Sequence, residues 1–372
     1  MKTKYIFTLT ALAGLFMSSC SDDRMYTLLE SSGLPVKLTA TIDHLNVTRV
    51  DDSGFTNGDC IGVYMVDFEN GTPATLKSEG NHADNLPCTY NSWSWDCPIS
   101  LFFKDATPAD FYGYYPYRKE IAAVESIPFS VQLNQSTEAS SSKLSGYESS
   151  DLLWAKTSGA SSVTSVINLR FNHILAGVEV SLVEGDGFDS GEWNNLEKSV
   201  MIDGTVRDGV FNLAAGLVQV KGSSDGRAII ANPTGNGFRA VVLPQTVSAG
   251  TNLVTINVGS DSYGFQKEVA MNYESGRLYK FTFEVSKRLP EGTYNFELIG
   301  EAITVWESDP VSHDGLSRAY QVVDMARGER LQKALETLDI NPKEVVNLKI
   351  KGFLYFQDSY YIRDNITKLP AL

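Results

Sequence analysis

The sequence predicts an all-β protein with two β-sandwich domains in tandem, followed by a small α/β extension. Short segments of alternating apolar and polar residues recur about every 8 to 12 residues, with turn-forming residues between them, which is typical of sandwiches. No pattern typical of a helix of useful length occurs before residue 325. We expect the two sandwiches to span residues 20–160 and 161–288, and the extension to span 289–372.

The composition supports a globular fold and excludes one class of partner. The chain has 372 residues, 42% of them hydrophobic, and a formal net charge of −14. This apolar content is enough to bury sizeable cores. An acidic surface repels phosphate groups, so we expect no nucleic-acid partner.

The first 19 residues have the pattern of a signal peptide. Lys2 and Lys4 precede an apolar run, residues 5–17, that is broken only by threonine and glycine. The run is shorter than the roughly 20 residues that a membrane-spanning helix needs. We therefore expect residues 1–19 to be removed from the mature protein.

Cys20 is the expected site of lipid attachment. Ser18 and Ser19 stand directly before it, as in a bacterial lipobox, so the acylated cysteine would become the mature N-terminus and insert into the lipid of the outer membrane. The next residues resemble the signal that sends some lipoproteins to the cell surface: Ser21, Asp22 and Asp23. The alternatives are an inner-leaflet lipoprotein or an uncut signal.

The first predicted strand runs from Val36 to Ile42, where apolar residues alternate with polar ones. It ends in a polar loop that contains Arg49. Further strand patterns follow at residues 58–66, 99–103, 110–117 and 127–133. These segments make up the expected N-terminal sandwich.

The cysteines after Cys20 allow at most one disulfide within the chain, because only Cys60, Cys88 and Cys97 remain. Cys88 and Cys97 flank a segment with the pattern of a short hairpin, and they can be bridged if their Cβ atoms face each other. The alternative is three buried thiols.

A linker rich in Ser, Thr and Gly, residues 157–165, marks the expected boundary between the two sandwiches. The strand patterns beyond it end at residues 279–285. There the side chains expected to share one face are those of Tyr279, Phe281, Phe283 and Val285.

The extension contains the one clear helical pattern of the chain. Apolar residues at spacings of i, i+3, i+4 and i+7 are Leu331, Ala334, Leu335 and Leu338. A strand is expected at 345–350, and Ile366, Leu369 and Leu372 then have the spacing of a leucine-rich repeat. We expect this extension to be the incomplete start of such a repeat region.

The sequence contains no convincing catalytic or metal-binding motif. Residues 222–226 fit the hydrolase pattern G-x-S-x-G, but a strand pattern follows where that motif requires a helix. The four histidines lack metal-ligand spacing, and His173 beside an apolar run is typical of a hydrogen-bonded structural residue. We therefore expect no enzyme activity, no metal and no cofactor.

Five aromatic residues could form a platform on which sugar rings stack: Trp93, Trp95, Tyr112, Tyr114 and Tyr117. The alternative is that these side chains belong to the core, since aromatic residues on strands are usually buried.

Several stretches resemble the Mfa-like fimbrillin family of cell-surface lipoproteins, over roughly residues 20–286. The stretches that carry the resemblance are Thr48–Arg49, Gly58–Tyr64, Asp110–Tyr117, Ser150–Ala155, Phe171–Ala176 and Leu243–Thr246. The resemblance implies that both sandwiches are transthyretin-like. It also implies a role as a fimbrial anchor, tip or adhesin on the outer membrane, with other fimbrial subunits as partners.

The resemblance further implies a mode of assembly. In pilus subunits of this family a protease cuts after an arginine in the loop that follows the first strand, and a strand from another subunit fills the groove. Arg49 stands where this cut would fall, and Val36 to Ile42 would be released. The alternatives are that Arg49 is an ordinary solvated residue, and that the protein is a lipoprotein that binds glycans or host proteins outside any pilus.

Overall fold

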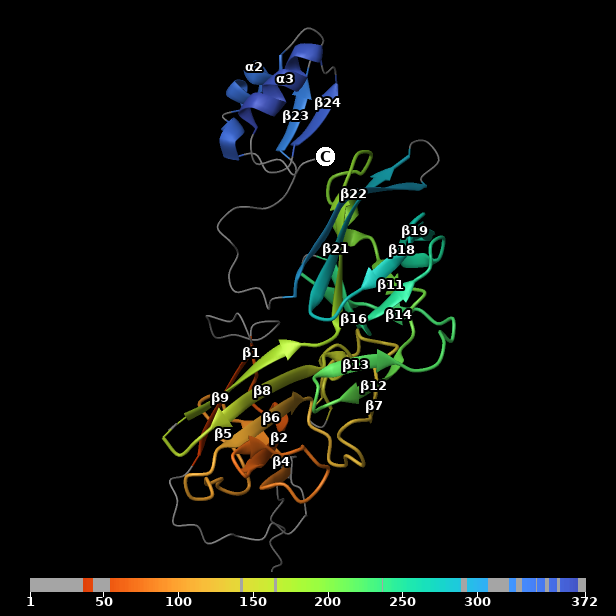
Figure 1. Ribbon diagram of the computed structural model, residues 1–372. Coiled ribbons are helices and arrows are strands. Elements are labelled where there is room, and N and C mark those ends of the chain that lie inside the picture. Colours follow the sequence, from red (N-terminus) through yellow and green to blue (C-terminus); the bar gives the residue numbers. More distant parts are fainter. Residues whose placement is uncertain are drawn as a thin grey trace, which may run out of the picture. The chain divides into compact units, whose positions relative to one another are not determined.

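The computed structural model describes residues 36–42, 54–140, 143–163, 166–235, 237–288, 293–306, 321–325, 330–338, 340–344, 348–352 and 355–366. The chain forms two compact units, residues 1–309 and 310–372. Figure 1 shows that the first unit is built almost entirely from strands. The prediction of a mostly β protein with a small α/β extension is confirmed.

An eight-stranded sheet forms the first half of unit 1 (Figure 1). Seven strands follow one another in the order β1 (Lys37–Ile42), β9 (Val166–His173), β8 (Leu153–Ala160), β6 (Ala109–Tyr115), β2 (Cys60–Glu69), β4 (Ala83–Tyr90) and β5 (Trp95–Asp96). The eighth strand, β3 (Thr72–Pro73), pairs with β2. β1 also contacts β5, so the two ends of this sheet approach each other.

The two faces of this sheet are covered by different cores, because successive residues of a strand point to opposite sides. In β6, Phe111 and Tyr115 point into the N-terminal core. Tyr112 and Tyr114 point into the main core. We use "N-terminal core" for the cluster around Leu38, Ile61, Met65, Phe111 and Phe171, and "main core" for the cluster that continues into the second half of the unit.

A small three-stranded sheet joins the two halves of unit 1. Its strands are β7 (Ile127–Ser130), β12 (Asp208–Asn212) and β13 (Leu217–Val220), with β12 in the middle. Phe129 from the first half and Phe211 from the second are both buried in the main core. The ring of Phe211 lies 6.4 Å from that of Tyr114, so the main core runs without interruption between the halves.

The second half is a two-layered sandwich. One layer contains β15 (Asn232–Thr234), β16 (Gly237–Val242), β10 (Ala176–Glu184), β21 (Arg277–Lys287) and β22 (Tyr294–Val305). The other contains β14 (Ile229–Ile230), β11 (Lys198–Ile202), β18 (Asn252–Val258) and β19 (Asp261–Gln266). Phe265 of β19 packs its ring 5.7 Å from Phe281 and 5.4 Å from Phe283 of β21, which ties the layers together.

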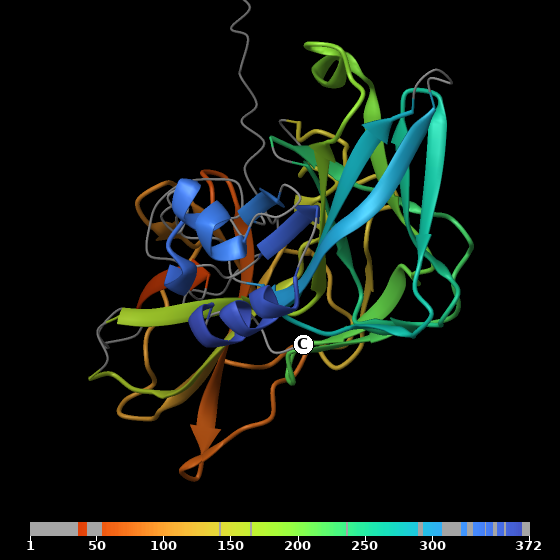
Figure 2. The same cartoon turned by 90° about the horizontal axis from the view of Figure 1, so that it is seen from above.

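Shorter elements complete unit 1. The two-stranded sheet β17 (Gln245–Val247) and β20 (Met271–Tyr273), the 3₁₀ turn η1 (Glu148–Ser150) and the helix α1 (Glu192–Asn195) lie between the main strands. The long strands β21 and β22 run side by side as an antiparallel pair in both views (Figure 1, Figure 2).

Both expected domain boundaries are wrong. The boundary between residues 160 and 161 falls inside one sheet, because β9 pairs with β1 and β8 rather than with the second sandwich. The boundary at 289 separates β21 from its partner β22. Trp306, which follows β22, is buried in the main core. The predicted Ser/Thr/Gly linker therefore begins with the last four residues of β8 and leads to β9 of the same sheet.

Unit 2 is a small α/β unit. Its elements are β23 (Gln321–Met325), α2 (Leu331–Thr337), η2 (Pro342–Glu344), β24 (Leu348–Gly352) and α3 (Phe356–Asn365). β23 and β24 are parallel, and the predicted helix is confirmed because Leu331, Ala334 and Leu335 are buried. Leu338 is exposed instead, since α2 ends one residue before it. None of the helices in the described part of the chain is long and apolar enough to span a membrane.

Candidate functional site

The strand β1 lies at one end of the eight-stranded sheet. It runs parallel to β9, from Lys37 opposite Val166 to Ile42 opposite Phe171, and β9 is its one strand partner among the described strands. An edge strand of this kind leaves one row of backbone donors and acceptors outside the ladder. Beyond the ladder, the Val36 N–H donates to the Leu101 carbonyl at 2.8 Å.

Two side chains fix β1 to the protein. Leu38 is 9% exposed and Ile42 is 7% exposed, and both lie in the N-terminal core. They stand beside Ile167 and Phe171 of β9, which are fully or almost fully buried. Departure of β1 would therefore uncover an apolar groove along β9.

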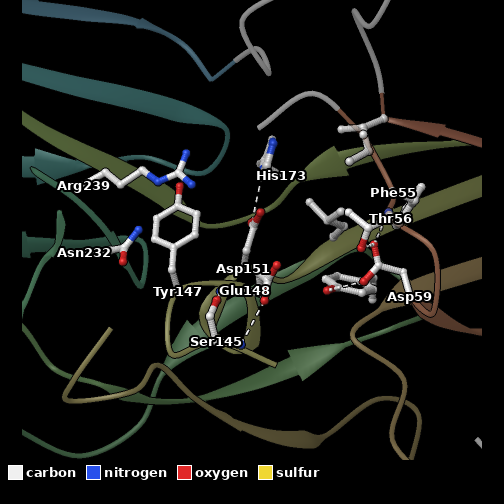
Figure 3. Close-up of a pocket in the computed structure, with 14 residues that line it drawn as sticks. Phe55, Thr56, Asp59, Ser145, Tyr147, Glu148, Asp151, His173, Asn232 and Arg239 are labelled. Carbon is white, nitrogen blue, oxygen red and sulfur yellow. Dashed lines mark hydrogen bonds and ion pairs between the residues drawn. The ribbon is translucent and has the colours of Figure 1, made fainter. Parts of the chain in front are cut away.

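A cavity of about 140 Å³ lies at the C-terminal end of β1 (Figure 3). Ile42, the last residue of β1, forms part of its wall. The other lining residues are Gly54, Phe55, Thr56, Asp59, Tyr115, Ser145, Tyr147, Glu148, Asp151, Leu153, His173, Asn232 and Arg239. In Figure 3, Arg239, Tyr147 and Asn232 lie on one side, Phe55, Thr56 and Asp59 on the other, and Glu148, Asp151 and His173 between them.

Asp59 is a buried carboxyl group with a full set of donors. Its Oδ2 accepts hydrogen bonds from the Thr56 N–H at 2.6 Å and from the Thr56 hydroxyl at 3.1 Å. Its Oδ1 accepts one from the Tyr115 hydroxyl at 3.1 Å. Burial raises the pKa of Asp59 above its ordinary value, and the hydrogen bonds oppose this only in part.

His173 is held by a carboxylate and an indole ring. Its Nδ1 lies 2.8 Å from Oδ1 of Asp151, and its ring stacks on Trp306 with centroids 4.1 Å apart and planes 7° apart. The Nε2 atom is buried and has no hydrogen-bond partner among the described residues. In the neutral tautomer whose Nδ1 donates to Asp151, Nε2 carries the ring's lone pair and is an unused acceptor.

Glu148 and Arg239 are positioned by neighbouring aromatic and polar groups. Glu148 accepts from the Ser145 N–H at 2.9 Å, and the Ser145 hydroxyl accepts from the Glu148 N–H at 3.1 Å, which fixes the start of η1. The guanidinium of Arg239 lies over the ring of Tyr147, with its carbon 4.2 Å from the ring centroid.

Comparison with known proteins identifies the family. The model of a family described as fimbrillin-like matches residues 48–306, which is most of the chain. The chain belongs to the fimbrillin-like family. The match includes every strand of unit 1 except β1, so β9 and every lining residue of the cavity except Ile42 lie inside it.

Two relatives of this fimbrillin-like chain come from Bacteroides species. A Bacteroides uniformis protein named as a fimbrium subunit, Fim1C, is 24% identical over 287 residues, covering 74% of this chain and 88% of the relative. A Bacteroides ovatus protein named as a fimbrium tip subunit is 29% identical over 154 residues, but the match covers 38% of this chain and only 26% of that relative.

Solved structures share the fold. A protein from Bacteroides uniformis, titled as a cell adhesion protein, gives a TM-score of 0.55 at 20% identity, over 75% of this chain and all of that one. A second, from Bacteroides ovatus, gives 0.55 at 15% identity over 74% of this chain and 99% of that one. At this identity the likeness concerns the fold of the fimbrillin-like chain alone.

Some predicted site residues of the fimbrillin-like chain lie outside the described residues. These are Cys20, Ser21, Asp22, Asp23 and Arg49. Cys88 and Cys97 are described and are joined by a disulfide, with their Cα atoms 4.3 Å apart. Cys60 is buried and takes no part in this bond.

The predicted aromatic platform is wrong. Tyr112 and Tyr114 are buried in the main core, and Tyr117 is packed against it. Trp95 packs against the N-terminal core on the other face of the sheet, and Trp93 is 93% exposed at the tip of the β4–β5 hairpin. The five rings cannot form one surface, because the sheet separates them.

The cavity was missed from the sequence, although His173 was expected to be a hydrogen-bonded structural residue and its bond to Asp151 confirms this. The lining residues come from six separate stretches of chain, and none of these stretches has a recognisable spacing. In the described part of the chain, no group of three or more His, Cys, Asp or Glu side chains is arranged to hold a metal ion.

Proposed function

We propose that this chain is a surface-exposed fimbrial subunit, an anchor, tip or adhesin component, that assembles by exchanging β1 for a strand of another subunit. The edge position of β1 carries this proposal. The family match and the name of the Bacteroides uniformis relative support a fimbrial role. No catalytic role is proposed.

The energetics favour replacement of β1 over its simple loss. Burying a side chain such as Leu38 or Ile42 contributes about 1.5 to 3 kcal/mol each. An incoming strand with apolar residues at these two positions would recover that burial, and its backbone would restore the ladder to β9. Without an incoming strand, the groove would stay exposed, which disfavours release.

Cleavage after Arg49 would make the exchange possible. The segment 43–53 connects Ile42 of β1 to Gly54 at the cavity. Once this connection is cut, the contacts of β1 with the described residues are non-covalent: its parallel ladder, the Val36–Leu101 bond, hydrogen bonds from the Thr39 and Thr41 hydroxyls to β9, and its apolar side chains in the N-terminal core. A competing strand can then displace it.

Limited digestion with an arginine-specific protease tests the proposal. The mature chain should give a fragment that begins at Val50, and a peptide that copies residues 36–42 should bind the digested protein after the original strand is released. The Arg49→Gln variant is the matched control and should stay uncut at this position. Resistance of Arg49 while other arginines are cut would overturn the mechanism.

We further propose that Cys20 is acylated and anchors the chain in the outer membrane, with Ser21, Asp22 and Asp23 directing it to the cell surface. Acyl chains contribute about 0.8 kcal/mol per buried CH₂. A Cys20→Ala variant should lose labelling by a fatty-acid probe and leave the membrane fraction. Retention of both would exclude this anchor.

A second candidate function is binding of a glycan or host protein, which the exposure of Trp93 favours. Its ring is 93% exposed, and it stands on a turn braced by Asn91, whose Oδ1 accepts from the Trp93 and Ser94 N–H groups at 3.0 and 2.7 Å. An exposed tryptophan on a braced turn suits stacking on a sugar ring or insertion into an apolar pocket. Tryptophan fluorescence should then change with a glycan or host-matrix panel, and Trp93→Ala should abolish the change. A flat response across both panels would exclude this function.

Two structural expectations also remain proposals. The division of the second half of unit 1 into layers of five and four strands supports a transthyretin-like sandwich. The parallel strands β23 and β24 with α2 between them support a leucine-rich-repeat start, in which each repeat pairs a strand with a helix. Experimental structures of longer relatives would test both.

A further inference from the structure

We infer that the cavity at the end of β1 is a specificity pocket for one lysine or arginine side chain, carried by the strand of another subunit that replaces β1. This inference rests on the proposed strand exchange. It adds the chemical identity of one residue in the partner strand and the position at which that residue must occur.

The size of the cavity fits one side chain. Pockets for small-molecule ligands usually measure about 300 to 1,000 Å³. This cavity measures about 140 Å³, which is too small for such a ligand. In strand addition, pockets beside the sheet edge receive alternate side chains of the added strand and so select its sequence.

The register of the sheet determines which side chain would enter. On β9, the buried residues alternate and end with Phe171 and His173. Ile42 stands opposite Phe171, and both Ile42 and His173 line the cavity. A strand in the place of β1 that continues for two more residues would bring its next inward-facing side chain opposite His173. The entering residue is therefore the second one after the position of Ile42.

The walls suit a long side chain with an apolar stem. Phe55, Tyr115 and Tyr147 supply aromatic surface, and Ile42 and Leu153 supply aliphatic surface. Lysine and arginine bury their methylene stems against such surfaces and place the charge at the end.

The polar groups of the cavity suit a cationic head. The lining contains three carboxyl groups, those of Asp59, Glu148 and Asp151, and one guanidinium, that of Arg239. The negative groups still outnumber the positive one when the buried Asp59 is protonated. Arg239 lies across the cavity from Asp59, over the ring of Tyr147.

The unused acceptor at His173 points to the same ligand. Its side chain is 4% exposed, and its Nε2 has no partner among the described residues. An N–H donor on the entering side chain would satisfy this lone pair. An apolar side chain would leave Nε2 without a partner, and an acidic one would be repelled by the carboxylates.

A peptide series tests the inference. The protein is digested with the arginine-specific protease until mass spectrometry shows release of the residues before position 50. Four fluorescent peptides are then compared: each copies residues 36–42 and continues with Gly and then Lys, Arg, norleucine or Glu. Norleucine matches the lysine stem and lacks its charge. We expect the Lys or Arg peptide to bind about 10- to 100-fold more tightly than the norleucine peptide, because hydrogen bonds to charged groups are strong in buried sites.

Isosteric variants assign the preference to the cavity. Glu148→Gln and Asp151→Asn should each reduce the ratio between the Lys and norleucine peptides. Glu69→Gln, at the exposed last position of β2, should leave it unchanged. The imidazole Cε1–H signal of His173 in NMR spectra should move with the Lys or Arg peptide and stay in place with norleucine.

The outcomes separate the inference from the proposed function. Equal binding of all four peptides would overturn the specificity pocket and leave strand exchange standing. If the original strand is not released, or if no peptide binds, strand exchange fails and the pocket inference fails with it. A preference for norleucine or Glu would contradict the assigned chemistry directly.

Discussion

The side chain of Gln135 makes two hydrogen bonds with the backbone of Val241. The Val241 N–H donates to Oε1, and Nε2 donates to the Val241 carbonyl, both at 2.8 Å. Gln135 is fully buried. It stands where β16 has run past its partner β15, which pairs only as far as Arg239. The amide thus takes the place of one strand residue and ties the segment after β7 to the second sandwich.

Replacement of Gln135 should destabilise unit 1 strongly. Gln135→Leu keeps the volume but leaves a buried N–H and a buried C=O on Val241 without partners, at about 1 to 3 kcal/mol for each group. We expect the free energy of unfolding to fall by roughly 2 to 5 kcal/mol in urea titrations. The exposed Gln132→Leu is the matched control and should have little effect. A loss of less than 1 kcal/mol in Gln135→Leu would show that water replaces the amide.

A methyl group at Gly62 should also be destabilising. Its Cβ would lie 2.1 Å from Cε1 of Tyr114, whose ring is 1% exposed and whose hydroxyl donates to Oδ1 of Asn85 at 2.7 Å. Overpacking of this kind costs about 1 to 3 kcal/mol. Gly62→Ala should lower the denaturation midpoint accordingly, whereas Gly235→Ala, where nothing lies within 4 Å, should not. Equal midpoints for the two variants would contradict the predicted clash.

The Cys88–Cys97 disulfide should contribute measurably to stability. It closes a loop with a sequence separation of 9 residues across the β4–β5 hairpin. Chain-entropy arguments give about 2 to 3 kcal/mol for a loop of this length. A Cys88→Ala, Cys97→Ala double variant should be less stable by that amount, and thiol reductant should destabilise the wild type but leave the variant unchanged. Insensitivity of the wild type to complete reduction would exclude this role.

The buried carboxyl of Asp59 should give stability a specific pH dependence. Burial raises the pKa of Asp59 in the folded chain, so the folded state holds this proton more tightly than the unfolded state does. As the pH rises from about 4, the unfolded pKa, through the folded pKa, the free energy of unfolding should fall, and above the folded pKa the loss is complete.

Asp59→Asn tests this dependence because an amide does not titrate in this range. The stability of the variant relative to the wild type should rise with pH over the same window and then level off. Urea titrations from about pH 4 to pH 7 measure this difference. A difference that falls with pH would show that the hydrogen bonds from Thr56 and Tyr115 outweigh burial, and a flat difference would show that they cancel it.

Local patterns predicted individual strands well. Tyr279, Phe281, Phe283 and Val285 were expected on one face of a strand, and all four are buried. The helix at Leu331 was placed correctly within a residue. A strand or helix with one buried face has apolar residues at a period of 2 or 3.6, and this period can be read directly from the sequence.

Pairing between distant strands was not predictable in the same way. β1 and β9 pair although well over a hundred residues separate them. No local sequence feature of either strand identifies the strand with which it pairs. The Ser/Thr/Gly linker before β9 marks a loop, but loop composition does not tell which sheet the next strand joins. The candidate site depends on this pairing, so neither the groove nor the cavity could be located from the sequence.

The aromatic prediction failed for a related reason. Tyr112 and Trp95 lie on strands of one sheet but face opposite cores. The presence of a tyrosine or tryptophan in a strand does not tell whether its ring fills a core or faces a ligand. Trp93 differs from the others because it lies in a turn, where a large apolar ring has no core to enter.

The pairing of β7 with β12 limits how the chain can fold as it emerges from a ribosome. Synthesis delivers β7 first, but Phe129 cannot be fully enclosed until β12 has followed with Phe211. Contacts of such high sequence separation form slowly. A chain in which β12 has not yet paired with β7 would present an unfinished apolar layer, which a holding chaperone would have to cover.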